Sequence, residues 1–148
     1  MPNNTTKLIL TALVLSTAGC NSVPRTELQN LPSLIEIVSF QVPEAQLKLR
    51  LSHRNKSTRE NNQLSCQLAI KDQPAFAFNA IPVPDMTTYA VETLDIDLRD
   101  QTMPAIVPGS AELPYVLDCF LFSENFRTEQ IVKRAILYLV PGSNDEYR

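Results

Sequence analysis

The sequence contains few side chains that could carry out chemistry. It has one histidine, His53, and three cysteines, Cys20, Cys66 and Cys119. A Ser-His-Asp or Cys-His site would need His53, which ends an alternating segment beside Arg54 with no motif around it. A zinc site needs three or four His, Cys or carboxylate ligands, which these residues do not supply. The sequence therefore predicts a non-enzymatic protein without a metal or other cofactor, and a surface or loop position for His53.

Three other kinds of site are also excluded. Asp95 and Asp97 could be a carboxylate pair for glycoside hydrolysis, but at spacing two on one strand they predict a solvated face. Outside the first 19 residues only Gly109 and Gly142 remain, so glycine-rich phosphate loops are absent. The chain has 13 basic and 16 acidic residues, and this balance argues against a nucleic-acid partner.

Cys20 follows a segment with the three parts of a secretion signal. Lys7 supplies a positive charge, residues 8–15 are apolar, and small residues lead to the cysteine, as Ser16-Thr17-Ala18-Gly19-Cys20. The apolar run is shorter than the roughly 20 residues that span a bilayer. The arrangement resembles the bacterial lipobox, with Thr17 where leucine is usual. The resemblance implies cleavage after residue 19 and acylation of Cys20; an ordinary secretion signal and an uncleaved anchor are the alternatives.

The lipid would fix where the protein resides. One acyl chain binds a membrane only marginally, at ~0.8 kcal/mol per buried methylene, whereas several chains anchor a protein stably. In lipoproteins of Gram-negative bacteria, Asp after the lipidated cysteine tends to retain the protein in the inner membrane. By that resemblance Asn21 favours the outer membrane, with the protein facing the periplasm. Residues 20–32 are polar and lack periodicity, which predicts a flexible tether.

Cys66 and Cys119 are left as a pair once Cys20 carries lipid. In an oxidising compartment such a pair predicts a disulfide. Both cysteines occupy the apolar parity of an alternating segment, so both are expected to point inward, as a bridge between two packed sheets. Two separate buried thiols are the alternative.

The chain from residue 33 onward shows the pattern of short strands. Apolar residues alternate with polar ones, or form short branched runs, over residues 34–40, 46–53, 63–71, 75–81, 88–98, 114–122 and 130–140. Turns rich in proline and asparagine separate these segments. About seven such strands predict an all-β, immunoglobulin- or fibronectin-like β-sandwich over residues 33–141, with a flexible tail over residues 142–148.

Two segments depart from simple alternation. The apolar parity changes within residues 88–98, which suggests a β-bulge. Residues 130–140 also fit helical spacing, so a C-terminal helix is the alternative to a strand there. Their β-branched content favours the strand.

The strand layout resembles the LEA14-like β-sandwich proteins (late embryogenesis abundant, group 2), some of which are bacterial lipoproteins. The resemblance lies in Leu47-Lys48-Leu49-Arg50-Leu51 before a polar turn, and in Ile81-Pro82-Val83-Pro84 before a later strand. Cys66 and Cys119 are not features of that family, and its turn glycine is missing near Gln73. The resemblance implies a small-ligand-binding or protective role without catalysis.

Two sets of residues could form a partner surface. Arg54, Lys56 and Arg59 cluster in one polar loop and could meet an anionic lipid or an acidic patch; a solvated loop is the alternative. In residues 114–122 one set of alternate residues is apolar and is expected to face the core. Phe120 and Phe122 belong to the other set, so they could form an exposed aromatic strip on the outer face of that strand. We expect a lipid-anchored protein that binds an envelope protein partner, as a secretion-system or envelope-assembly accessory.

Overall fold

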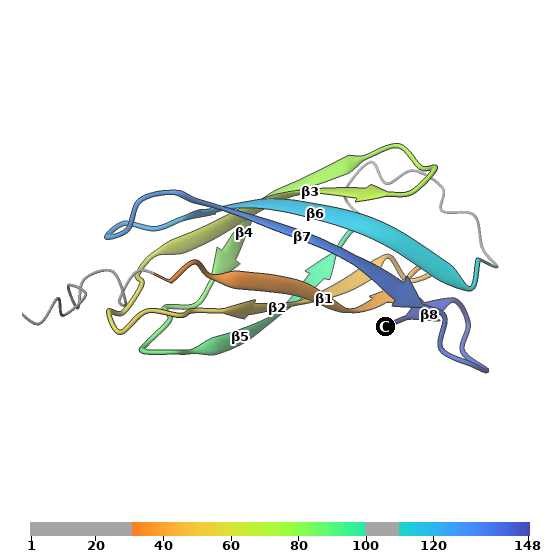
Figure 1. Cartoon of the computed structure of the whole chain (residues 1–148), viewed down its shortest axis with the longest axis horizontal. Coiled ribbons are helices and arrows are strands. Elements are labelled where there is room, and N and C mark those ends of the chain that lie inside the picture. The colour runs from red at the N-terminus through yellow and green to blue at the C-terminus, as the bar shows by residue number, and fades with distance from the viewer. Residues whose placement is uncertain (1–30, 100–109) are drawn as a thin grey trace, which may run out of the picture.

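The computed structural model describes residues 31–99 and 110–148, and within them all regular secondary structure is β (Figure 1). The strands are β1 (Leu34–Gln41), β2 (Gln46–Ser52), β3 (Asn62–Ile70), β4 (Phe76–Val83), β5 (Val91–Asp97), β6 (Glu112–Phe122), β7 (Glu129–Tyr138) and β8 (Glu146–Tyr147). Two four-stranded sheets form, in the orders β5-β2-β1-β8 and β4-β3-β6-β7. The predicted β-sandwich is confirmed. The leader, Cys20 and tether residues 20–30 lie outside the described residues.

The order of strands specifies the type of sandwich. In constant-type immunoglobulin domains the fourth strand joins the sheet of the first strand. Here β4 pairs with β3 instead, and β6 and β7 complete that sheet. No helix among the described residues is long and apolar enough to cross a membrane.

Alternation along each strand builds the core between the sheets. On β2, Leu47, Leu49 and Leu51 point inward and are almost completely buried, while the intervening Lys48 and Arg50 stay in contact with solvent. The facing sheet contributes a matching set of buried apolar residues: Leu64, Leu68, Phe78, Leu117 and Leu121. Burial of these side chains is the main favourable contribution to folding.

The expected bulge in residues 88–98 is wrong. β5 pairs with β2 in an unbroken register from Ser52↔Val91 to Gln46↔Asp97. Tyr89 precedes the strand, in a turn with a φ of 54°. Val91, the first residue of β5, points to solvent, whereas Leu94 and Ile96 point into the core, so the change of parity reflects an exposed valine and not an extra residue.

Bulges occur instead in β1 and between β3 and β4. The register of β1 shifts between Ile37 and Ser39. Because one extra residue reverses the parity, Ile37 and Phe40 both point into the core.

Within residues 130–140 the chain forms a strand, which ends at Tyr138, and not the alternative helix. β7 pairs with β6 along its whole length. Ile131 and Leu137 face the core, and Val132 and Ile136 face outward, so the apparent helical spacing reflects apolar residues on both faces of the strand.

The expected flexible tail over residues 142–148 is also wrong. β8 pairs with Phe40 and Gln41 of β1, and Tyr147 is 1% exposed. The Tyr147 hydroxyl donates to the carbonyl of Ser110 at 2.9 Å. The Pro141-Gly142 pair begins a turn, with Gly142 at a φ of 76°. This turn returns the chain to the core.

The disulfide is present, but within one sheet. Cys66 and Cys119 are bonded and lie directly opposite each other on β3 and β6, with Cα atoms 4.1 Å apart. Both are buried. The expectation that they point inward is therefore confirmed, whereas the expected bridge between sheets is wrong because both strands belong to the same sheet.

Candidate partner-binding surfaces

The outer face of the β4-β3-β6-β7 sheet carries a group of exposed large apolar side chains. We define the outer patch by five residues on β6 and β7: Phe120, Phe122, Val132, Ile136 and Tyr138. Phe120 and Phe122 are 42% and 43% exposed. Such a group on one face is typical of an interaction site.

The register brings two of these side chains together. Val132 stands opposite Asp118, and Phe120 stands opposite Gln130, so Phe120 and Val132 are diagonal neighbours across β6 and β7. Ile136 and Tyr138 continue the same face of β7. The Gln130 side-chain amide donates to the Asp118 carboxylate at 3.0 Å, which places a polar pair within the patch.

The two sets of residues that the sequence predicts as partner surfaces differ in exposure. Phe120 and Phe122 are exposed on the sheet face, as expected of a partner surface. Lys56 is exposed and Arg54 half-buried, both in the loop between β2 and β3. Arg59 is wrongly assigned to that surface, because its side chain is only 5% exposed.

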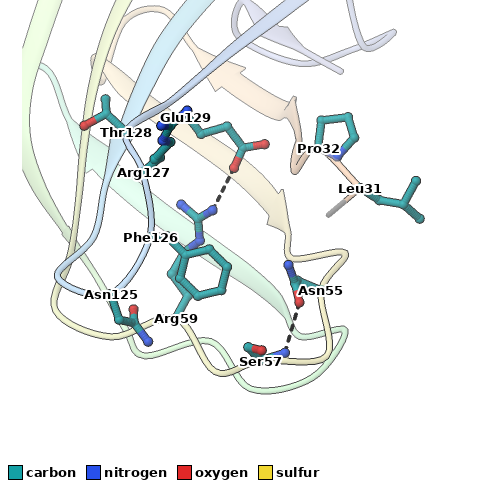
Figure 2. A pocket seen from close by; sticks show the side chains of 10 residues that line it. All are labelled: Leu31, Pro32, Asn55, Ser57, Arg59, Asn125, Phe126, Arg127, Thr128 and Glu129. Carbon is teal, nitrogen blue, oxygen red and sulfur yellow. Dashed lines mark hydrogen bonds and ion pairs between the residues drawn. The ribbon is translucent and has the colours of Figure 1, made fainter. Parts of the chain in front are cut away.

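Arg59 lies at the end of the sandwich where β1 and β7 begin, which we call the tether end. Its guanidinium Nη2 is 2.9 Å from Oε2 of Glu129, and Nη1 donates to the Ser123 hydroxyl at 3.2 Å. The ring of Phe126 covers the guanidinium at 4.5 Å (Figure 2). Burial lowers the pKa of Arg59, and the charge of Glu129 opposes this shift.

Glu129 also holds the start of the fold. Its carboxylate accepts the backbone N–H of Ser33 at 2.5 Å and the Ser33 hydroxyl at 2.9 Å. Ser33 is buried. One carboxylate therefore joins the beginning of β1 to the β2–β3 loop through Arg59.

A second polar set packs beside this pair. The Ser123 hydroxyl donates to the Asn62 side chain at 2.7 Å, and the Asn62 amide donates to the carbonyls of Arg59 and Pro84, each at 3.0 Å. His53 is buried, with Nε2 2.6 Å from the carbonyl of Ser57. His53 lies in the loop that follows β2, which is one of the two positions expected for it, but its ring is enclosed and not on the surface. These contacts hold the loops of the tether end together.

An open hollow of about 780 Å³ adjoins this cluster and is lined by residues that include Leu31, Asn55, Arg59, Phe126 and Arg127 (Figure 2). Two buried atoms there, His53 Nδ1 and Arg59 Nε, have no hydrogen-bond partner among the described residues. The Arg59 charge is already matched by Glu129. The described part of the chain also contains no group of three or more potential metal ligands. Because Glu129 pairs with Arg59 and also accepts two hydrogen bonds from Ser33, the cluster joins three segments of the fold.

A narrower hollow lies between β1 and β7. It has a volume of about 310 Å³, and we call it the edge groove. Its lining includes Leu34, Ile35, Arg50, Ile131, Val132 and Lys133.

Sequence reasoning missed the Arg59–Glu129 pair and the role of Phe126. The two charges are 70 residues apart, and no spacing rule joins them. Phe126 did carry a signal, since it is a lone aromatic residue in the polar loop between β6 and β7.

Comparisons with known proteins add little to this description. No protein-family model and no curated protein matches the chain. Among solved structures, the chain is similar to Bacteroides uniformis beta-glucuronidase 2 covalently bound to cyclophellitol-6-carboxylate aziridine, with 11% identity and a TM-score of 0.38. The match covers 72% of this chain and 13% of that one.

Proposed function

We propose that this protein is a non-enzymatic lipoprotein of the outer membrane, held by lipid on Cys20, whose β-sandwich binds an envelope protein partner. The outer patch is the observation that carries the binding role. Phe120 and Phe122 expose aromatic surface on a sheet whose opposite face already supplies the core. Aromatic side chains in the centre of an interface contribute disproportionately to binding.

The anchoring part of the proposal rests on the lipobox-like leader. An oxidising compartment agrees with the Cys66–Cys119 disulfide. β1 begins at Leu34, so residues 20–33 separate the lipid site from the first strand. Fourteen residues in extended conformation span at most about 50 Å, which keeps the sandwich near the membrane surface.

A small-ligand-binding or protective role, implied by the LEA14-like resemblance, would need an apolar cavity between the sheets. The inner faces instead meet through large buried side chains such as Phe40, Phe78 and Leu117. The larger hollow lies at the tether end, and the edge groove opens at the side of the sandwich, so neither is a cavity enclosed by the inner faces of the two sheets. This arrangement favours the partner-binding proposal.

Crosslinking in intact envelopes followed by purification tests the binding role. The unaltered protein should yield one stoichiometric protein partner. The double variant Phe120→Ser/Phe122→Ser should lose it. Val91→Ser, which alters a more exposed apolar residue on the other sheet, should retain it. Absence of a partner under every growth condition would refute the proposal.

Metabolic labelling with palmitate tests the anchor. The unaltered chain should incorporate label and fractionate with outer membranes. Cys20→Ser should abolish labelling and release the protein. A Cys20→Ser variant that stays labelled would refute the anchoring proposal.

A further inference from the structure

The edge groove is bordered by two strands that run in the same direction. β8 is antiparallel to β1, and the bridge between Leu139 and Tyr147 is also antiparallel. β1 and β7 are therefore parallel to each other, and both begin at the tether end (Figure 1). They belong to different sheets, so the groove is the side opening of the sandwich.

β7 presents main-chain groups to this opening that pair with no other strand in the described part of the chain. The Tyr138 N–H donates to the carbonyl of Arg148 at 2.8 Å, on the groove side, whereas the Leu139 N–H donates to Ala111 at 3.0 Å, beside β6. Because these directions alternate along a strand, Val132 and Arg134 point their N–H and C=O groups the same way as Tyr138. Among the described residues, β7 pairs only with β6 from Glu129 to Leu137.

The facing edge of β1 is similar. The Ile37 N–H points away from β2 and donates to the Tyr115 hydroxyl at a long distance of 3.4 Å. By the same alternation, Ile35 directs its N–H toward the groove.

The far end of the same opening already holds a strand. β8 forms main-chain pairs with Phe40 and Gln41 of β1. Beyond it, Arg148 and Tyr138 exchange N–H to carbonyl bonds at 2.8 and 3.0 Å. At the β8 end, this opening therefore holds a short extended segment that is antiparallel to both β1 and β7.

The walls of the open part indicate what a further strand would carry. Leu34, Ile35, Ile131 and Val132 make them mainly apolar. Arg50 is paired with Glu36 at 3.1 Å, whereas Lys133 has no carboxylate at ion-pair distance among the described residues. Lys133 shares the parity of the buried Ile131 and is half-buried. An inward charge of this kind blocks non-specific edge pairing, and it favours an occupant with an acidic side chain.

We propose that the edge groove accepts an extended segment of a partner protein, which pairs antiparallel with β7 beyond β8, places apolar side chains between β1 and β7, and carries a carboxylate toward Lys133. Addition of a strand to an open edge is a common mode of peptide recognition. The inference depends on the proposed role in partner binding and adds the form of the partner.

Hydrogen exchange on the full chain in detergent, with the acetylated peptide Val-Thr-Asp-Thr-Val-Thr as the probe, tests the proposal. In the paired strand, the two valines and the aspartate of the peptide would point into the groove. Its three threonines would point to solvent. At saturation it should slow exchange of the Val132 and Arg134 amides by about tenfold. The same peptide methylated on alternate amide nitrogens should give no protection, because it cannot pair. Equal protection by both peptides, or by neither, would overturn the inference.

Two variants of one residue provide a matched control. Val132→Pro removes the N–H that faces the groove and should abolish protection at Arg134, whereas Val132→Thr keeps the N–H and should preserve it. Lys133→Ala should weaken binding of the aspartate peptide more than that of its asparagine analogue. If both respond equally to Lys133→Ala, the proposed carboxylate contact is wrong.

Two further outcomes separate this inference from others. A concentration-dependent dimer that Val132→Pro dissolves would identify a second copy as the occupant and overturn the assignment to a separate partner. Phe120→Ser/Phe122→Ser should leave peptide protection intact. If the peptide protects β7 but no envelope partner is found, the proposed function is refuted and the groove inference is not. If an envelope partner still binds the Val132→Pro variant and the peptide gives no protection, the groove inference is refuted and the proposed function is not.

Discussion

Arg59 and Glu129 form a largely buried ion pair that ties the β2–β3 loop to the start of β7, with Nη2 and Oε2 2.9 Å apart. Glu129 also accepts two hydrogen bonds from Ser33. The first residues of the sandwich, where a tether would enter, are thus fixed by a charge contact and not only by sheet pairing.

Removal of the carboxylate charge should destabilise the fold strongly. Glu129→Gln leaves the buried Arg59 guanidinium without its anion, and the loss of one partner of a buried pair costs about 3 kcal/mol. Urea unfolding measures this loss. Asp95→Asn, which breaks the exposed pair with Lys48, should cost less than about 1 kcal/mol. Equal losses in the two variants would show that the Arg59 pair is not effectively buried.

The strands could be predicted from the sequence because the residues that face the core alternate with polar residues within each strand. Leu47, Leu49 and Leu51 alternate with polar residues, so local periodicity alone predicts β2. The Arg59–Glu129 pair was not readable, because only the folded chain brings together two loops that are distant in sequence. The local sequence around Arg59 therefore predicts a solvated loop, although its side chain is buried.

The position of the disulfide shows the same limit. Alternation predicts correctly that Cys66 and Cys119 point inward, but it does not say which strands are neighbours. β3 and β6 pair within one sheet, a result of the non-local connection between them. Tyr147 was missed for a related reason, since a two-residue strand after Pro141 and Gly142 is too short to show a period.

Loss of the disulfide should reduce stability substantially. The bridge closes a loop of 54 residues, counting both cysteines, since their separation is 53. In the chain-entropy treatment such a loop contributes about 4 kcal/mol. Cys66→Ala/Cys119→Ala should show this loss in urea unfolding, and dithiothreitol should destabilise the unaltered protein but not the variant. Equal sensitivity of both to the reductant would contradict the prediction.

Tyr147 should anchor the end of the chain to the core. Tyr147→Ala removes a fully buried aromatic ring and should cost about 3–4 kcal/mol. Tyr147→Phe removes only the hydrogen bond to Ser110 and should cost about 1 kcal/mol. Thermal unfolding separates these values. A negligible effect of Tyr147→Ala would restore the interpretation of residues 142–148 as a free tail.

Asp97 should titrate at unusually low pH. Hydrogen bonds from the Arg99 side chain, and then from its backbone N–H, lower the pKa of Asp97 from 3.8 to about 2. Because the folded pKa is depressed, the contribution to stability is present above pH 3.8 and is lost as the pH falls through about 2. Carboxyl-carbon NMR should follow this titration. Arg99→Gln should return the pKa toward 3.8, and the distant Arg148→Gln should leave it unchanged.

Ala80 occupies a backbone position that suits glycine. It lies at the bulge between β3 and β4, where the register shifts opposite Ser65, with a φ of 54°, and its N–H donates to the Ser65 hydroxyl at 3.2 Å. A left-handed conformation costs a residue with a side chain about 1 kcal/mol. Glycine also increases the entropy of the unfolded chain, which offsets part of this gain, so Ala80→Gly should stabilise the protein by a few tenths to about 1 kcal/mol. Ala77→Gly, on the same strand and without a positive φ, should destabilise it by about 0.5–1 kcal/mol. Urea unfolding of the two variants should therefore shift in opposite directions, and a shared direction would show that the bulge does not strain Ala80.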